Sequence, residues 1–118
     1  MKILIVDDSR VMRAMITRAL EASPLSVELL EAADGLEALA RIPESPDLIL
    51  CDWNMPNMNG VEFVRQIRED LDETPVIMIT TECHFAKKQE ATNAGVTAFL
   101  PKPFTPDQLA EQILEVAG

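Results

Sequence analysis

The sequence predicts an α/β fold in which helices cover both faces of a parallel, doubly wound five-stranded sheet. Five short apolar runs alternate with five amphipathic segments along the 118 residues, and a βα order repeated five times implies parallel strands joined by right-handed crossovers. Three of the runs are apolar on both faces, as central strands between two layers of helices are. No repeat, low-complexity tract or Gly/Ser-rich linker interrupts this alternation, so we expect residues 1–118 to form one domain.

The strands differ in polarity, and the difference predicts their places in the sheet. Central strands are predicted at the three nearly continuous apolar runs, which are Lys2–Val6, Asp47–Cys51 and Pro75–Thr80. Val27–Glu31 and Thr97–Leu100 are shorter and mix polar with apolar residues, which is typical of flanking or edge strands.

The first two helices are predicted from apolar spacing and from residues that start or stop a helix. Ser9 is a suitable N-cap for a helix that runs to about Ala22. Within it, apolar residues recur three and four positions apart, at Met12, Met15, Ile16 and Ala19. The second helix is expected from Gly35 to about Ile42, where Pro43 ends it.

The remaining three helices are predicted in the same way. Apolar residues at helical spacing indicate helices at Asn59–Asp70 and at Thr105–Ala117, the latter with Pro106 near its first turn. The segment Ala86–Gly95 is the weakest of the five, because alanines are its only apolar residues. We expect this helix to be largely exposed and loosely held.

The charge of the chain limits the classes of function that it can serve. Ten Lys and Arg residues against 20 Asp and Glu residues leave a net charge of −10, which excludes general nucleic-acid binding as the first interpretation and favours cations as ligands. The apolar runs are far shorter than the roughly 18 residues of a membrane span, and no secretion signal is visible, so we expect a cytoplasmic protein without membrane insertion. Cys51 and Cys83 match no disulfide framework or CxxC pair, and we expect both to be reduced thiols.

Polar residues follow or close four of the five predicted strands. They are Asp7 and Asp8 after the first, Asp52 after the third, Thr80 and Thr81 at the end of the fourth, and Lys102 just after the fifth. In doubly wound sheets the working site lies beyond the carboxyl ends of the strands, so all of these residues are expected at one edge.

Three carboxylates at one edge repel one another unless a cation joins them, and ligands that are all oxygen select a hard ion such as Mg²⁺. A lysine and a hydroxyl beside the ion suit the remaining oxygens of a phosphoryl group. Each residue alone has an ordinary structural role, such as a helix N-terminal charge or a turn residue. Their coincidence at four strand ends predicts a site for a phosphoryl group and Mg²⁺.

The same residues carry a resemblance to a known family. Asp7-Asp8, the stretch 52–60 (DWNMPNMNG), Thr80 and the run 102–104 (KPF) together resemble the receiver domain of two-component response regulators. Within that family the chain is most similar to the stand-alone chemotaxis regulators, the CheY-like group. The resemblance covers essentially the whole chain, and it implies a flavodoxin-like (βα)5 sandwich with strand order 2-1-3-4-5.

The resemblance also implies a mechanism, in a signalling domain that is not an enzyme in the usual sense. Asp52 would accept a phosphoryl group from a sensor histidine kinase or a phosphotransfer domain. Asp8 and Asp52 would bind Mg²⁺ directly, Asp7 through water, and Asn54 through its backbone carbonyl. Lys102 would pair with Asp52 or with its phosphoryl oxygens, and the family implies a cis bond before Pro103.

The switch that the resemblance implies couples this site to a binding surface. The Thr80 hydroxyl would move to the phosphoryl group, and the Phe99 ring would turn inward into the space that it leaves. The face formed by the fourth helix, the fifth strand and the fifth helix would change, and a downstream protein target would bind it. The sequence leaves open whether the protein is a monomer or a phosphorylation-dependent dimer.

Several positions near the site differ from the family pattern or vary within the family. Phe99 replaces the tyrosine of the best-known chemotaxis regulators, and Thr81 stands where a small residue is common. Asn54 and Glu82 occupy the two variable positions that flank the site and match the chemotaxis pattern. Trp53 is expected to form a partly exposed lid beside Asp52.

Two other functions compete with the signalling switch. A receiver-like interaction module that works without phosphorylation would lack an acidic residue or Lys102, and all of these are present. A phosphohydrolase with an aspartyl-phosphate intermediate needs a second acid/base carboxylate and a capping element, for which a chain with tight connections leaves little room. The sequence does not separate a complete single-domain regulator from the receiver of a longer one.

Overall fold

The computed structural model describes residues 1–117, and it contains five parallel strands in the order β2-β1-β3-β4-β5. The predicted fold class and strand order are therefore confirmed. The elements in chain order are β1 (Lys2–Val6), α1 (Arg10–Glu21), β2 (Glu28–Ala32), α2 (Gly35–Arg41), the 3₁₀ turn η1 (Ile42–Glu44), β3 (Leu48–Asp52), α3 (Gly60–Glu69), β4 (Val76–Thr80), α4 (Phe85–Ala94), β5 (Ala98–Pro101) and α5 (Pro106–Ala117).

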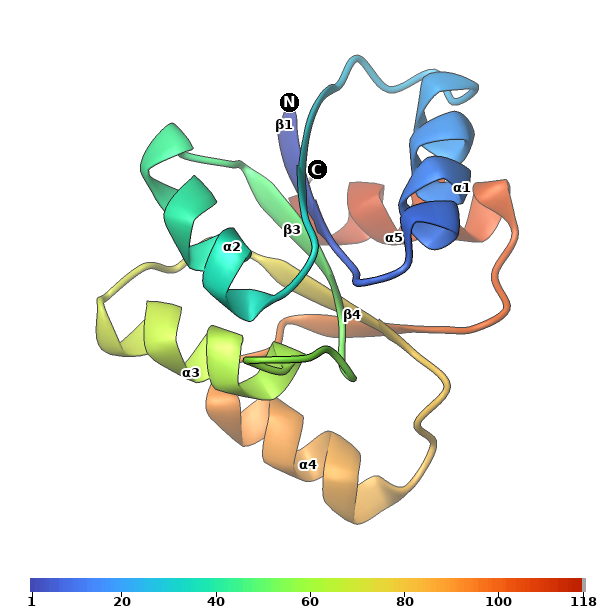
Figure 1. Cartoon of the computed structure of the whole chain (residues 1–118). Coiled ribbons are helices and arrows are strands. Elements are labelled where there is room, and N and C mark those ends of the chain that lie inside the picture. Colours follow the sequence, from blue (N-terminus) through green and yellow to red (C-terminus); the bar gives the residue numbers. More distant parts are fainter. Residues whose placement is uncertain (118) are drawn as a thin grey trace.

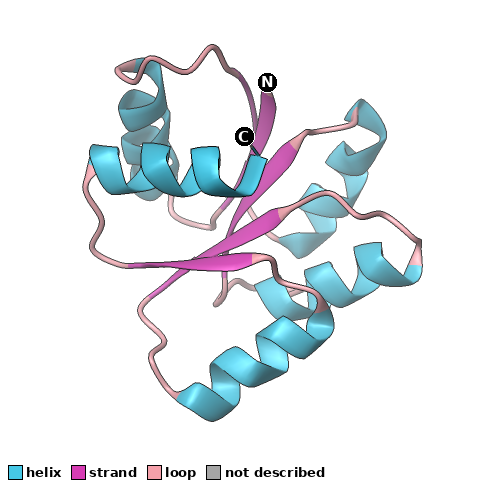
Figure 2. Cartoon of the chain, turned by 180° about the vertical axis from the view of Figure 1, so that it is seen from behind, coloured by secondary structure: helices cyan, strands magenta, loops and turns pink. Residues whose placement is uncertain are grey.

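Two apolar layers hold the sheet between the helices. Figure 1 shows α1 and α5 side by side on one face of the sheet and α2, α3 and α4 in a row on the other, and Figure 2 shows the same layers from behind. Alternate residues of each central strand enter opposite layers, so that Ile3 and Ile5 pack towards α1 and α5, whereas Leu4 and Val6 pack towards α2, α3 and α4. This alternation explains why the central strands are apolar throughout.

Several element boundaries differ by a residue from those predicted. β3 ends at Asp52 instead of Cys51, so Asp52 is the last residue of the strand. The second helix ends at Arg41, and Pro43 lies in the 3₁₀ turn that follows. The prediction that Met15 lies on the buried face of α1 is wrong. Its side chain is 55% exposed, and the buried residues of this helix are Ile16 and Leu20.

Helix α4 is the least buried of the layer, as predicted. Only Ala91 and Ala94 of its side chains are buried, and Phe85 at its first position is 80% exposed. Polar contacts supplement this small apolar contact: Arg65 of α3 forms an ion pair with Glu90 at 3.6 Å, and the Arg68 guanidinium donates two hydrogen bonds to the carbonyl of Gly95.

Truncation of Phe63 is expected to destabilise the fold strongly. Its ring is fully buried between the sheet and α3, and Phe63→Ala removes that burial and leaves a cavity, which lowers the free energy of unfolding by about 3–5 kcal/mol. Urea denaturation of the metal-free protein measures the change. Phe85→Ala is the matched control, because Phe85 is exposed and its truncation is expected to change stability by less than about 0.5 kcal/mol. Equal losses in the two variants would contradict the assignment of Phe63 to the core.

Among residues 1–117, no helix combines the length and the apolar character that crossing a membrane requires.

Candidate functional site

The register of the sheet brings the predicted strand-end residues to one edge. Val6 of β1 pairs with Cys51 of β3, so Asp7 follows β1 at the level where Asp52 ends β3. Likewise Thr80, the last residue of β4, pairs with Pro101 of β5, and Lys102 comes directly after it. The carboxyl ends of four adjacent strands therefore supply side chains to the same place.

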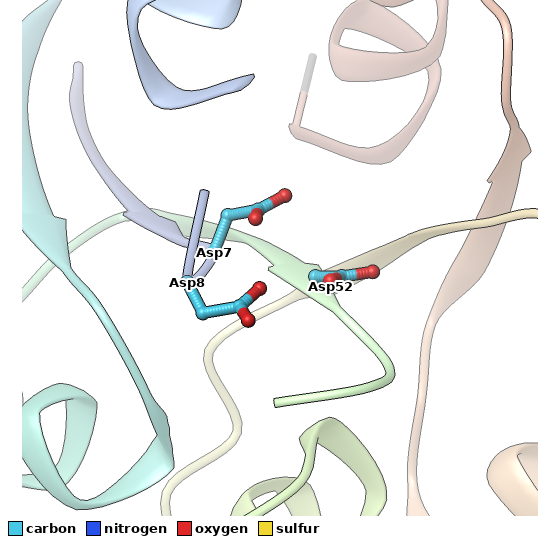
Figure 3. A group of neighbouring side chains, drawn as sticks. All are labelled: Asp7, Asp8 and Asp52. Atoms are coloured by element: carbon cyan, nitrogen blue, oxygen red, sulfur yellow. The ribbon is translucent and has the colours of Figure 1, made fainter. Parts of the chain in front are cut away.

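Three carboxylates meet there. Figure 3 shows Asp7, Asp8 and Asp52 directed into a common region, and one carboxylate oxygen from each lies within 4.8 Å of the others. Mg²⁺ holds oxygen ligands at about 2.1 Å, so two ligands of one ion lie at most about 4.2 Å apart. The cluster therefore fits a divalent ion after small side-chain movements. Its members differ in exposure, since Asp7 is buried, Asp52 is half-buried and Asp8 is exposed.

Asp7 has the most buried carboxylate of the three. Burial raises its pKa, and the nearby charges of Asp52 and Asp8 act in the same direction. The backbone N–H of Ser9, which donates to Oδ1 of Asp7 at 2.8 Å, and the ammonium of Lys102 oppose this rise. A carboxyl group in this position binds a proton or a cation more readily than an ordinary surface aspartate.

The raised pKa of Asp7 predicts the sign of a pH effect in the metal-free protein. The folded state binds the proton more tightly than the unfolded state does, so ionisation of Asp7 makes the protein less stable as pH rises through its folded-state pKa. Asp7→Asn should therefore be more stable than wild type at neutral pH in EDTA. The difference should shrink as pH falls towards the ordinary value of 3.8. Urea denaturation at several pH values measures it, and a difference independent of pH would contradict the assignment.

Lys102 connects two of the carboxylates. Its Nζ donates a hydrogen bond to Oδ1 of Asp52 at 3.2 Å and lies 3.7 Å from Oδ2 of Asp7. The same oxygen of Asp52 accepts a hydrogen bond from the backbone N–H of Trp53 at 2.9 Å. The Asp52 carboxylate is thereby oriented by one charged and one neutral donor on the chain itself.

Thr80 and the loop after β5 complete the edge. The Thr80 hydroxyl is buried, and its oxygen accepts a hydrogen bond from the backbone N–H of Glu82 at 3.0 Å. The carbonyl of Thr80 accepts from the backbone N–H of Lys102 at 3.0 Å, and the bond between Lys102 and Pro103 is cis, as expected. Asn54 and Thr81 are exposed near this edge.

The prediction for Trp53 is wrong. Its side chain is only 8% exposed and packs in the apolar layer beneath α2, α3 and α4, so it forms no lid. The reason is geometric: Trp53 directly follows β3, and successive side chains point to opposite sides, so Asp52 faces the carboxylates while the indole turns towards the core.

Two residues near the site were not predicted. The Arg13 guanidinium donates to the carbonyl of Asp7 and to Oε1 of Glu31, at 2.6 and 2.9 Å. Asp34 is a buried carboxylate that caps α2 and accepts a hydrogen bond from Asn57. The position of Asp34 before an amphipathic segment signals an N-cap, but its contact with Asn57 spans 23 residues and has no local signal.

Comparisons with known proteins find relatives over nearly the whole chain. A family model described as the response regulator receiver domain matches residues 3–114. The chain is 44% identical to the chemotaxis protein CheY1 of Helicobacter pylori, over all of this chain and 98% of that protein. It is 40% identical to the chemotaxis protein CheY homolog of Campylobacter jejuni, over all of this chain and 93% of that protein.

A solved structure shares the fold as well as the sequence. The chemotaxis protein CheY4 of Vibrio cholerae superimposes with a TM-score of 0.87 and 42% identity, covering 98% of this chain and 97% of that one.

Proposed function

This chain belongs to the family of response regulator receiver domains, within its CheY-like group, and from that membership we propose that it is a phosphorylation-controlled switch of a two-component phosphorelay. We propose that residues 1–118 are one receiver domain. The observation that carries the proposal is the contact between the Lys102 ammonium and the Asp52 carboxylate, 3.2 Å apart, beside the carboxylates of Asp7 and Asp8.

Asp52 is the proposed phosphoacceptor. An oxygen of its carboxylate attacks the phosphorus of a phosphohistidine on a sensor kinase or phosphotransfer domain, the P–N bond breaks, and an acyl phosphate forms on Asp52. The bond electrons leave with the imidazole, which takes up a proton. Loss of the phosphoryl group to water returns the carboxylate. Lys102 supports this role because its charge lies where the phosphoryl oxygens would gather.

The residues that would hold Mg²⁺ are Asp8 and Asp52 directly, Asp7 through water, and Asn54 through its backbone carbonyl. When bound, the ion offsets the charge of the carboxylates and of the phosphoryl oxygens. Exposure supports the different roles of Asp8 and Asp7 in binding the ion. Asp8 is open to solvent, whereas Asp7 is buried and already contacts Ser9 and Lys102.

The proposed switch joins Thr80 to the surface of α4, β5 and α5. The Thr80 hydroxyl can donate its proton to a phosphoryl oxygen, and Phe99 would follow by turning inward. In support, Phe99 is half-buried against the core, and Nζ of Lys88 on α4 lies 5.5 Å from the centre of its ring. A moving ring would therefore change its contact with a thinly packed helix, and a downstream protein target would bind the altered surface. Thr81 and Glu82 would flank the path of the phosphodonor.

The proposal is tested by the intact mass of the purified protein after incubation with Mg²⁺ and acetyl phosphate, with EDTA as the metal-free control. We expect a gain of one phosphoryl group only when Mg²⁺ is present. If acetyl phosphate fails because Thr81 restricts the site, phosphorylated histidine kinases are the second set of donors. Failure with all donors would overturn the proposal in favour of a module that works without phosphorylation.

A further inference from the structure

Asp34 is a buried carboxylate that the proposed chemistry does not use. It is 7% exposed, and it lies before the first residue of α2. Its two oxygens have separate partners: Oδ1 accepts from the backbone N–H of Glu37 at 2.8 Å, and Oδ2 accepts from the side-chain amide of Asn57 at 2.7 Å. These hydrogen bonds hold the pKa of Asp34 below its ordinary value, so the group is an ionised acceptor at neutral pH.

A second contact joins the same two segments. The backbone N–H of Gly35 donates to the carbonyl of Met58 at 3.1 Å. A Cβ on Gly35 would lie 2.7 Å from Cγ of Met58 and 2.8 Å from the Met58 carbonyl oxygen, so only glycine allows this approach. Asn57 has a φ of 67°, in the left-handed region that asparagine adopts more readily than most residues. The start of α2 therefore holds two successive residues of the segment between β3 and α3.

This segment, residues 53–59, is the one that would supply a metal ligand. It begins directly after Asp52 and contains Asn54, whose carbonyl is the proposed backbone ligand of Mg²⁺. Its two ends are joined by a hydrogen bond, because the backbone N–H of Gly60, the residue after the segment, donates to the Trp53 carbonyl at 2.8 Å. Near its second end, Asn57 and Met58 bind Asp34 and Gly35 at the start of α2. Asn54 lies between Trp53 and these two residues, and its own side chain is exposed.

We propose that Asp34 and Asn57 are positioning residues for the metal site, and that their hydrogen bond holds the segment 53–59 so that the Asn54 carbonyl can meet the ion. This inference rests on the proposed function. Mg²⁺ requires nearly ideal octahedral geometry, so a backbone ligand on a loop has to be held in place before the ion arrives. Groups that hold metal ligands affect affinity without touching the metal.

Three variants distinguish the loss of the hydrogen bond between Asp34 and Asn57 from the loss of the α2 cap and from the loss of the Asp34 charge. Asp34→Ser keeps a capping oxygen for α2 but is too short to reach Asn57. Asn57→Gly keeps the left-handed backbone and removes the amide. Asp34→Asn removes the charge but keeps both contacts, because the Asn57 amide can turn its oxygen towards the new amide group. Ile113→Val, in the opposite apolar layer, is the control for a general loss of stability.

The experiment is calorimetric titration of MgCl₂ into each metal-free protein. We expect Asp34→Ser and Asn57→Gly each to raise the dissociation constant about tenfold, and the double variant to add little, because both remove the same contact. The dissociation constants of Asp34→Asn and Ile113→Val should stay within about twofold of the wild-type value, since neither substitution breaks the contact between residues 34 and 57. In phosphorylation by acetyl phosphate, the Mg²⁺ concentration that gives the half-maximal rate should rise about tenfold in Asp34→Ser and in Asn57→Gly, and should stay within about twofold of wild type in Asp34→Asn and Ile113→Val.

The outcomes distinguish the two proposals. A wild-type protein that binds no Mg²⁺ would overturn the proposed function and this inference with it. Wild-type binding with less than about a threefold change in Asp34→Ser and Asn57→Gly would overturn the inference alone. The inference would also fail if Asp34→Asn or Ile113→Val weakened Mg²⁺ binding as much as Asp34→Ser does, because charge or general stability would then account for the effect.

Discussion

Asp52→Asn should yield no detectable phosphorylated protein under conditions in which the wild type is phosphorylated. The amide is nearly the same size as the carboxylate and can still accept hydrogen bonds from Lys102 and from the Trp53 N–H, so the fold is preserved. It lacks the anionic oxygen that attacks phosphorus. Intact mass spectrometry after incubation with Mg²⁺ and acetyl phosphate measures the loss.

The control for this variant is Asp70→Asn, the same substitution at an exposed position that follows α3. It should be phosphorylated normally. The unfolding transition of Asp52→Asn in EDTA should also remain cooperative, because the change takes one charge from a cluster of three carboxylates and opens no cavity. A normal phosphorylated fraction in Asp52→Asn would remove Asp52 from the role of acceptor.

Mg²⁺ at tens of times its dissociation constant should raise the free energy of unfolding by about 2 kcal/mol, because an ion that binds only the folded state stabilises it by mass action. The gain should shrink in Asp8→Ala. Asp8 is the exposed member of the cluster, and its carboxylate is the one most open to an ion from solvent. Urea denaturation with MgCl₂ and with EDTA measures the gain.

Asp70→Ala serves as the matched control for Asp8→Ala and should keep the full gain. In EDTA, the stability of Asp8→Ala should be close to that of the wild type or higher, because the substitution removes a negative charge that lies near two others. If the gain from Mg²⁺ were the same in Asp8→Ala as in the wild type, the ion would bind at another place on the chain.

Most of the fold was predictable because its signals are local. The runs at β1, β3 and β4 are apolar on both faces, and this pattern is visible without knowledge of what packs on each side. The weak helix α4 was also recognisable from its alanines. The exposure of Met15 was not predictable in this way, because apolar spacing places a residue on a helix face but the packing of neighbouring elements determines how much of that face is covered.

The candidate site was predicted from where the strands end. Asp7, Asp52, Thr80 and Lys102 needed only the rule that carboxyl ends of parallel strands share an edge, and the register of the sheet places them there. The exposure of Trp53 was predicted wrongly because it depends on whether the side chain that follows β3 points into an apolar layer or towards the site.

By itself, the sequence determined the order and number of the strands and α-helices, the parallel sheet and the set of polar residues at its edge, since each follows from periodicity or from position along the chain. Tertiary structure alone decided which carboxylate is buried, that Lys102 contacts Asp7 as well as Asp52, and that Asp34 binds Asn57. The physical reason is that burial, pKa and hydrogen-bond partners depend on groups that are distant in sequence and are brought together only by packing.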